Sequence, residues 1–579
     1  MASDPTPFET PESELGHSPL ISAPSGNQRS FSSRKVLAGI VSFLGFLRRY
    51  WATLLFLGLA LGLLGWVTWE AFWLRSVTYI ATADYWEHSA VLRALIDHPW
   101  HPGNPHLLSS ASSPRFGPQF VLIALVARAL HLDAVQAMSL TAVFNTALFL
   151  WGIHSFFRCY FRDRLAPLYG LIVMFCSWWH AWQYSNVYQL DVYFSVASYP
   201  STTTLALTLL GFALAVRVLR GQVRYPRAAL VVLTLWAGAV FIIHQLTAVM
   251  SLSGALLLAI SEPNVRWRPR LQVAATVIVG AALSHFWPYF SPWEVLHGGK
   301  TDDQWMSQSV DQAVKLKDDA ARHFRRHHFY RIKGLQNALG LSLLGLVALP
   351  YFWLRPRRWF VGLGALSMLA PFAVNAFVEL PLGHRFVLLA IFYLQVAVVW
   401  ILLALTPGYA RSLSVLRRLW AKLIAIPLLI AVLGVFGYHN VEAALKSLSH
   451  GRFNSQSPAV REGGAVGDAA GPHAVVIALT PLCWPVPTFG PKCLTLLHTN
   501  PLVGDEGERE RWLNRFFNDR VSDAERSSIV ERYGVSHVLI RWGPRGSLAE
   551  FLANHATAVP LTKASGLRLY ALNARPIAP

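Results

Sequence analysis

Two carboxylates and a histidine lie close together in the sequence soon after the first long apolar segment, Trp51–Leu74. They are Asp84, Glu87 and His88. Ionisable groups beside a membrane are costly to keep there, which makes them candidates for a functional site, and a carboxylate can take a proton from a hydroxyl as a general base. Asp84 with Glu87 three positions later also matches a capping box that begins a helix over Tyr85–Ile96. The local sequence leaves both interpretations open.

The composition indicates what must hold these residues in place. Of 579 residues, 54% are hydrophobic and 14% are charged, whereas soluble domains average about 25% charged residues. We therefore expect an α-helical polytopic membrane protein. The net charge of +19 is scattered between apolar segments, which is a topology signal, so nucleic acid is not an expected partner. The 22 Trp and 18 Tyr suit a protein with two membrane interfaces.

The apolar segments predict about eleven transmembrane helices. Arg and Lys precede the first one, which places the N-terminus in the cytoplasm by the positive-inside rule. Pro118–Leu132 is short for a span and is expected to be an interfacial or re-entrant helix. The predicted spans are Trp51–Leu74, Ala134–Phe157, Leu165–Trp182, Thr202–Leu219, Ala228–His244, Gln245–Ile260, Leu271–Tyr289, Leu335–Leu354, Phe360–Val378, Val387–Leu405 and Leu423–Tyr438.

Shifts in composition predict the domain organisation. Residues 1–33 form a disordered cytoplasmic tail, 34–440 the transmembrane domain, 441–472 a linker and 473–579 a small α/β domain. The long outer loops are 75–117 and 291–333. This arrangement predicts a multi-pass protein of the bacterial inner membrane with a periplasmic C-terminal domain.

The C-terminal domain has a mixed pattern of strands and helices. Expected strands are Ala474–Thr480, Cys493–Leu497, Val535–Trp542 and Leu567–Leu572, and expected helices are Glu508–Asn518, Asp523–Tyr533 and Ser547–His555. Cys483 and Cys493 share one Pro-rich loop. In an oxidising compartment this proximity predicts a disulfide.

The order of these elements resembles that of the GT-C glycosyltransferases. A cytoplasmic N-terminus and one span are followed by an outer loop opening with an acid, a short apolar helix and further spans, roughly over Trp51–Tyr289. The likeness is to the mannosyltransferase-like branch, which includes aminoarabinose transferases. It implies that Asp84 is the catalytic base of an inverting transfer from a polyprenyl-phosphate sugar. Glu87, His88 and Asp191 would support it, although the second acid of that branch is missing from Tyr199–Ser201.

The same resemblance implies cations that hold the departing lipid phosphate. His384 and Arg385 follow an expected span, and Arg325 and Arg326 belong to a basic cluster in the second outer loop. The alternatives are a structural ion pair for Arg385 and a headgroup-bound helix face for the cluster. Some relatives bind a divalent metal, for which Glu87 and His88 offer ligands, but no standard metal spacing occurs.

The sequence thus predicts transfer of a sugar to a glycan or glycolipid acceptor of the cell envelope, at the outer face of the membrane and in contact with membrane lipids. One alternative is an envelope enzyme like an O-antigen ligase or polymerase. Another is a non-catalytic transport or scaffold protein of the envelope, although a transporter predicts paired repeats and broken helices at the midplane.

Overall fold

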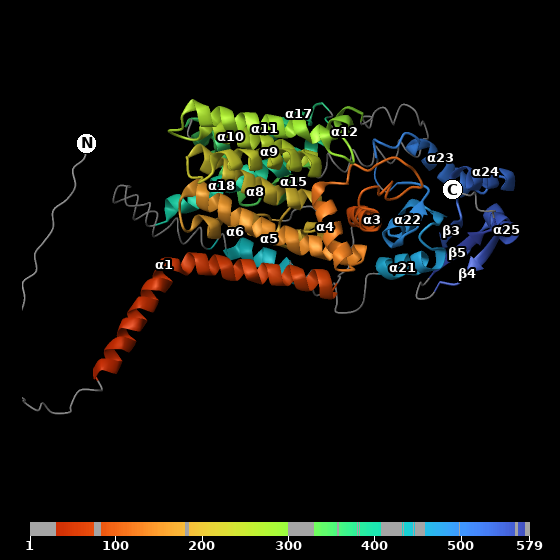
Figure 1. The fold of residues 1–579 in the computed structure, drawn as a ribbon, viewed down its shortest axis with the longest axis horizontal. Helices are drawn as coiled ribbons and strands as arrows, with labels where there is room; N and C mark the ends of the chain where they lie inside the picture. The colour runs from red at the N-terminus through yellow and green to blue at the C-terminus, as the bar shows by residue number, and fades with distance from the viewer. Residues whose placement is uncertain are drawn as a thin grey trace, which may run out of the picture. The chain divides into compact units, whose positions relative to one another are not determined.

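The structure is a computed structural model (Figure 1). It describes residues 30–74, 83–179, 185–298, 329–355, 358–378, 380, 382–406, 431, 434–443, 445, 458–496, 498, 500–561 and 566–573. The chain divides into two units, residues 1–54 and 55–579. In the first, the described residues belong to helix α1 (Ser30–Trp69), so residues 30–33 of the expected disordered tail are helical.

The described residues contain five helical segments that are long and apolar enough to cross a membrane, and a sixth if the bent pair α15 (Ile332–Leu339) and α16 (Ser342–Trp353) forms one span. The bend between these two helices is 88°. The five segments are Tyr50–Phe72 in α1 and the π-helix η1 (Glu70–Leu74), α5 (Ala134–Phe161), α8 (Pro200–Leu219), α9 (Pro226–Ile243), and Gly383–Leu405, formed by η4 (Gly383–Arg385) and α18 (Phe386–Leu405).

Further helices are shorter. Four of them are apolar: α4 (Pro118–Ala129), α6 (Ala166–Cys176), α10 (Gln245–Ser261) and α17 (Trp359–Val374). The others are α7 (Leu190–Val196), α11 (Trp267–Leu283), the 3₁₀ turn η2 (Ser284–Phe286) and α12 (Pro292–Gly298).

A multi-pass membrane protein is therefore confirmed, while the number of eleven spans stays a prediction. Most predicted spans coincide with a helix, but α6 ends at Cys176, six residues before the predicted end at Trp182. Two residues after Cys176, the indole N–H of Trp178 donates a hydrogen bond to the Met174 carbonyl oxygen over 2.8 Å. The last predicted span, Leu423–Tyr438, lies mostly outside the described residues. The expected interfacial segment Pro118–Leu132 forms α4.

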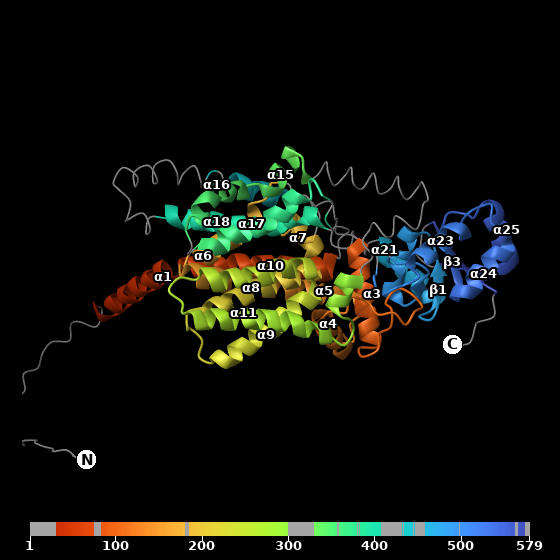
Figure 2. The same ribbon diagram turned by 90° about the horizontal axis from the view of Figure 1, so that it is seen from above.

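Small residues let the apolar helices approach one another closely. α5 lies against α8, and α9 lies against α11 (Figures 1 and 2). A Cβ atom placed on Gly152 of α5 would come within 2.9 Å of the Ala206 carbonyl oxygen of α8. Membrane helices pack through such small residues because lipid offers no hydrophobic driving force between them.

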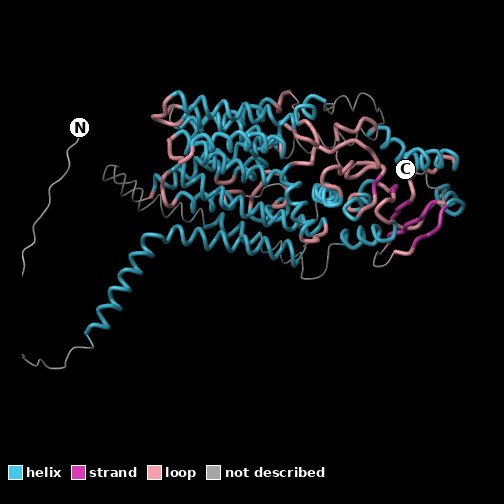
Figure 3. The backbone as a smooth tube through the Cα atoms, in the orientation of Figure 1, coloured by secondary structure: helices cyan, strands magenta, loops and turns pink. Residues whose placement is uncertain are grey.

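The C-terminal domain contains a five-stranded sheet in the order β2-β1-β3-β5-β4 (Figure 3). β1 is parallel to both β2 and β3, and β5 runs antiparallel to β3 and β4. Helices α23, α24 and α25 contribute Phe516, Ile529 and Phe551 to its core. The elements are β1 (Val475–Ile477), β2 (Lys492–Cys493), α23 (Glu506–Phe516), α24 (Asp523–Tyr533), β3 (His537–Arg541), α25 (Gly546–His555), β4 (Ala556–Val559) and β5 (Leu567–Leu572).

The structure corrects two features predicted for this domain. The strand expected over Cys493–Leu497 ends at Cys493, and β4 was not predicted. Residues 458–470 of the expected linker form helix α21 (Pro458–Ala470). The glycines that suggested a flexible linker instead allow close packing, because a Cβ atom on Gly463 or Gly467 would collide with Phe489. Helix α21 therefore packs on η7 (Val486–Phe489), while the domain boundary at residue 473 stays a prediction.

Candidate active site

Helix α3 (Ala83–Asp97) holds Asp84 in its first turn. The helix buries Tyr85, Trp86 and Leu92 against its surroundings. It packs on α4, on α5 and on η7 (Val486–Phe489) of the C-terminal domain. The carboxylate thus lies at the positive end of a helix dipole, where a negative charge is stabilised.

Glu87, one turn further along α3, is a buried and paired carboxylate. Its side chain is only 8% exposed, and Arg115 Nε lies 3.0 Å from Oε1 while Nη2 lies 3.4 Å from Oε2. Burial is the largest single effect and acts to raise the pKa of Glu87, but Arg115 and the nearby histidines together outweigh it and lower that pKa. Glu87 therefore remains ionised as the partner of Arg115.

Asp84 differs from Glu87 in being accessible. Its side chain is 44% exposed, and Oδ1 lies 2.6 Å from Nε2 of His498 in the C-terminal domain. Burial acts to raise the pKa of Asp84, but the contact with His498 and the nearby positive charges hold it well below its usual range. The same contact raises the pKa of His498 against the effect of burial. Asp84 is thus an ionised carboxylate open to solvent.

The structure does not support the capping-box interpretation. The first helical residue of α3 is Ala83, so Asp84 lies inside the helix and is not its N-cap. In a capping box the acid three positions after the cap turns back to the start of the helix. Here both oxygens of Glu87 face Arg115 instead.

The histidines of the first outer loop have separate surroundings. His88 is buried, with its ring 5.5 Å from Phe120 and 5.2 Å from Tyr199. Burial and the charge of Arg115 lower its pKa to about 4, so His88 is neutral at neutral pH. His106 is buried as well, and burial lowers its pKa to about 4. His98 and His101 are exposed.

The sequence offers Glu87 and His88 as possible ligands of a divalent metal, but the structure groups other side chains. Donor atoms of Asp84, Glu87 and His498 all lie within 4.8 Å of one another. Arg115, however, already faces both oxygens of Glu87, so a cation bound there would lie next to a guanidinium group. The arrangement therefore fits a metal ion poorly.

Arg385 forms the end of η4, and its Nη1 atom lies 3.5 Å from Ser185 Oγ. Its role at the donor phosphate stays a prediction.

For the remaining predicted site residues, the described structure gives no contact with Asp84. The ring of His384 packs at 4.8 Å from that of Phe329. Asp191 begins the short helix α7, and its supporting role stays a prediction. Arg325 and Arg326 lie outside the described residues.

Two residues of the site were not predicted. Arg115 lies in the same predicted outer loop as Asp84, and an arginine in a predicted outer loop runs against the positive-inside rule, so this signal was present in the sequence. His498 lies hundreds of residues from Asp84, in a segment that follows the expected strand. Only the docking of the C-terminal domain on α3 brings it to the carboxylate.

Comparisons with known proteins rest on structure alone. No family model and no curated protein matches the chain. ArnT from Cupriavidus metallidurans is similar at a TM-score of 0.50 and 14% identity, over 90% of this chain and 97% of that one. The oligosaccharyltransferase of Archaeoglobus fulgidus is similar at a TM-score of 0.48 and 12% identity, over 86% of this chain and 70% of that one. The mycobacterial arabinofuranosyltransferase AftD is similar at a TM-score of 0.43 and 15% identity, over 86% of this chain and 42% of that one.

At this level of identity, a match to ArnT over nearly the whole of both chains shows a shared fold. The described elements include one long apolar helix, helix α3 with Asp84 in its first turn, the short helix α4, further apolar helices and a C-terminal α/β domain. The chain therefore shares its fold with ArnT, and this fold is that of a polytopic α-helical membrane protein.

Proposed function

We propose that this protein is an inverting glycosyltransferase. It moves a sugar from a polyprenyl-phosphate donor to a glycan or glycolipid acceptor of the cell envelope, at the outer face of the bacterial inner membrane. The observation that carries the proposal is the contrast between two carboxylates of α3. Glu87 is buried and held by Arg115, whereas the Asp84 side chain is ionised and 44% exposed.

The reaction assigns one role to Asp84. The acceptor hydroxyl oxygen attacks the anomeric carbon from the face opposite the lipid phosphate. As the new C–O bond forms, the bond between that carbon and the phosphate oxygen breaks, and the hydroxyl proton passes to the Asp84 carboxylate. The products are the inverted glycoside and free polyprenyl phosphate. Because phosphate is a competent leaving group, the base must only be ionised and within reach of the hydroxyl.

Arg385 is proposed to hold the departing phosphate. A guanidinium group can bind phosphate oxygens through two parallel N–H bonds. The place of Arg385 directly before α18, where a long apolar helix begins, suits a ligand with a lipid tail and a charged head.

The proposal is tested by the products of purified protein in nanodiscs. We supply synthetic polyprenyl-phosphate sugars together with lipids and glycans extracted from the envelope, and we measure polyprenyl phosphate and glycosylated acceptor by mass spectrometry. We expect both products in equal amounts. Turnover with nucleotide sugars in place of the lipid-linked donors would contradict the proposal.

A further inference from the structure

We propose that His498 of the C-terminal domain is a positioning residue that orients the carboxylate of Asp84 for proton transfer. This inference rests on the proposed function, because it assigns His498 a role in the reaction of Asp84. It makes the C-terminal domain a part of the active site.

The geometry separates the two oxygens of Asp84. His498 Nε2 lies 2.6 Å from Oδ1 and 3.6 Å from Oε2 of Glu87. A carboxylate has two oxygens and about four lone-pair sites. With Oδ1 facing the imidazole, Oδ2 can accept the proton of the acceptor hydroxyl. A neighbouring side chain that holds a general base in one orientation raises the rate, because small errors in the position of a reacting group lower the rate strongly.

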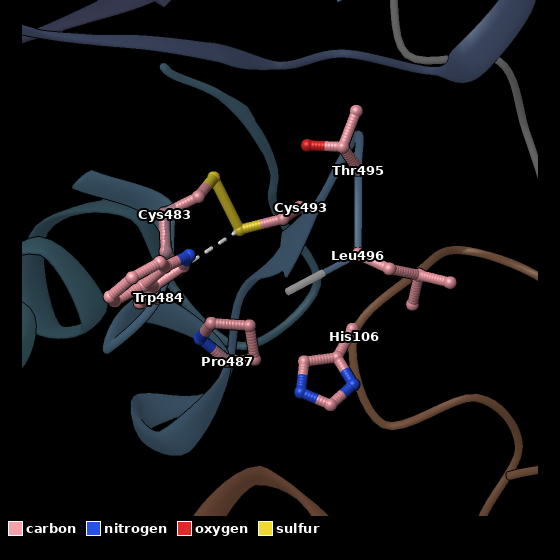
Figure 4. A pocket seen from close by; sticks show the side chains of 7 residues that line it. All are labelled: His106, Cys483, Trp484, Pro487, Cys493, Thr495 and Leu496. Carbon is pink, nitrogen blue, oxygen red and sulfur yellow. Dashed lines mark hydrogen bonds between the residues drawn. A yellow bond between two sulfur atoms is a disulfide. The ribbon is translucent and has the colours of Figure 1, made fainter. Parts of the chain in front are cut away.

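The chain ties both flanks of His498 to the first outer loop. Before it, the Cys493 backbone N–H donates to the His106 carbonyl oxygen over 2.6 Å, and Leu107 pairs with Cys493 as an extra bridge at the edge of the sheet. Cys493 also forms a disulfide with Cys483, beside the small pocket that His106 lines (Figure 4). These contacts fix the start of the segment that carries the histidine.

After His498, Asn500 anchors the other flank. Its side-chain amide donates to the Ser112 carbonyl oxygen over 2.9 Å, and its backbone N–H donates to Glu506 Oε2 over 3.1 Å. Asn500 is only 6% exposed. A histidine held at both flanks to the loop that follows Asp84 loses little further freedom when it contacts that carboxylate. This is the property expected of an orienting group.

Independent contacts keep the domain docked on α3. Ser89 and Thr488 form a buried hydrogen bond of 2.7 Å between their hydroxyl groups. Lys492 Nζ donates to the carbonyl oxygens of Asn104 and Pro105 over 2.8 and 3.2 Å. These bonds do not involve His498, so its replacement leaves the docking of the domain in place.

The test combines substitutions of His498 with that of Asp84 in full-length protein. His498→Ala removes the imidazole, and His498→Gln keeps an N–H donor near the position of Nε2. His473→Gln, an exposed histidine of the same domain, is the matched control. We expect His498→Ala to lower kcat by about 10-fold to 10²-fold with little change in the acceptor KM. His498→Gln and added imidazole should each restore part of the rate, and the control should match the wild type.

The double variant decides whether His498 acts through Asp84. In an Asp84→Asn background, His498→Ala should cause no further loss, because the group that it orients is gone. Full activity of His498→Ala beside an inactive Asp84→Asn protein would overturn this inference and leave the proposed function standing. An active Asp84→Asn protein would instead remove the proposed function.

Two further results would also overturn the inference. One is failure of both His498→Gln and imidazole to restore any activity to a folded protein. The other is a stoichiometric divalent metal in the wild-type protein, measured by elemental analysis, that is lost in His498→Ala. That result would make His498 a metal ligand.

Discussion

Arg115 places its Nε atom 3.0 Å from Oε1 of Glu87, and this ion pair distinguishes two acids that stand one helical turn apart. The Glu87 side chain is 8% exposed and the Arg115 side chain is 34% exposed. The pair fixes the first outer loop against α3. It leaves Asp84 as the accessible one of these two acids.

Removing Arg115 should destabilise the protein by leaving Glu87 buried without its partner. We expect Arg115→Gln to lower the free energy of unfolding by about 1–3 kcal/mol, since losing one partner of a buried pair costs more than losing both. The double variant Arg115→Gln, Glu87→Gln should recover most of this loss. Thermal unfolding in detergent compares the three proteins, and a double variant less stable than Arg115→Gln alone would refute this account of the pair.

Replacing Arg385 should weaken donor binding more than chemistry. We expect Arg385→Gln to raise the KM for a polyprenyl-phosphate sugar by about 10-fold or more, because a charge-assisted hydrogen bond to phosphate is lost. Arg355→Gln is the control, since Arg355 is exposed and its guanidinium lies over the Tyr351 ring. An unchanged donor KM in Arg385→Gln would exclude Arg385 from the donor site.

The disulfide gives a prediction that needs no activity assay. Alkylation of unreduced, denatured protein should modify Cys159 and Cys176, which are free, and should leave Cys483 and Cys493 linked in one peptide pair. Mass spectrometry of the digest reports both outcomes. Alkylated Cys483 and Cys493 in protein purified without reductant would show that the bond does not form.

Glu506 should make the C-terminal domain less stable as pH rises. Burial raises the pKa of Glu506 to about 7, from a usual value of 4.5. The folded state therefore binds this proton more tightly than the unfolded state. The free energy of unfolding falls as the pH rises from 4.5 to about 7 and stays lower above that range. Glu506→Gln should raise the thermal midpoint at pH 8 and change it little at pH 4.5. An equal change of the thermal midpoint at pH 8 and at pH 4.5 would contradict the raised pKa of Glu506.

Much of the fold could be predicted because membrane spans and helix ends carry local signals. Asp523–Tyr533 was predicted with its observed bounds, since Ser522 caps its start and Gly534 adopts a left-handed conformation at its end. Helix α21 could not be predicted in this way. Its glycines disfavour a helix in isolation, and only the packing of Gly463 and Gly467 against Phe489 explains it.

The candidate site could be predicted only in part, because only some of its residues carry a local signal in the sequence. Asp84 could be identified because it is the first carboxylate after a long apolar segment, and this position is visible in the sequence. The pairing of Asp84 with His498 depends on how a separate domain docks on α3. No local pattern around His498 encodes that contact, because the residues that create it are Thr488, Lys492 and Asn500 together with their partners in the first loop.

The most direct test of the account is the rate of sugar transfer by Asp84→Asn compared with Asp97→Asn. Both acids lie on α3, and Asp97 forms an exposed ion pair with Arg93 at 2.7 Å. Asparagine keeps the size of aspartate but cannot take the proton, so Asp84→Asn should lose about 10²–10⁴-fold in rate at normal expression and stability. Asp97→Asn should retain the wild-type rate. Wild-type transfer by the Asp84→Asn protein would contradict the assignment of Asp84 as the catalytic base.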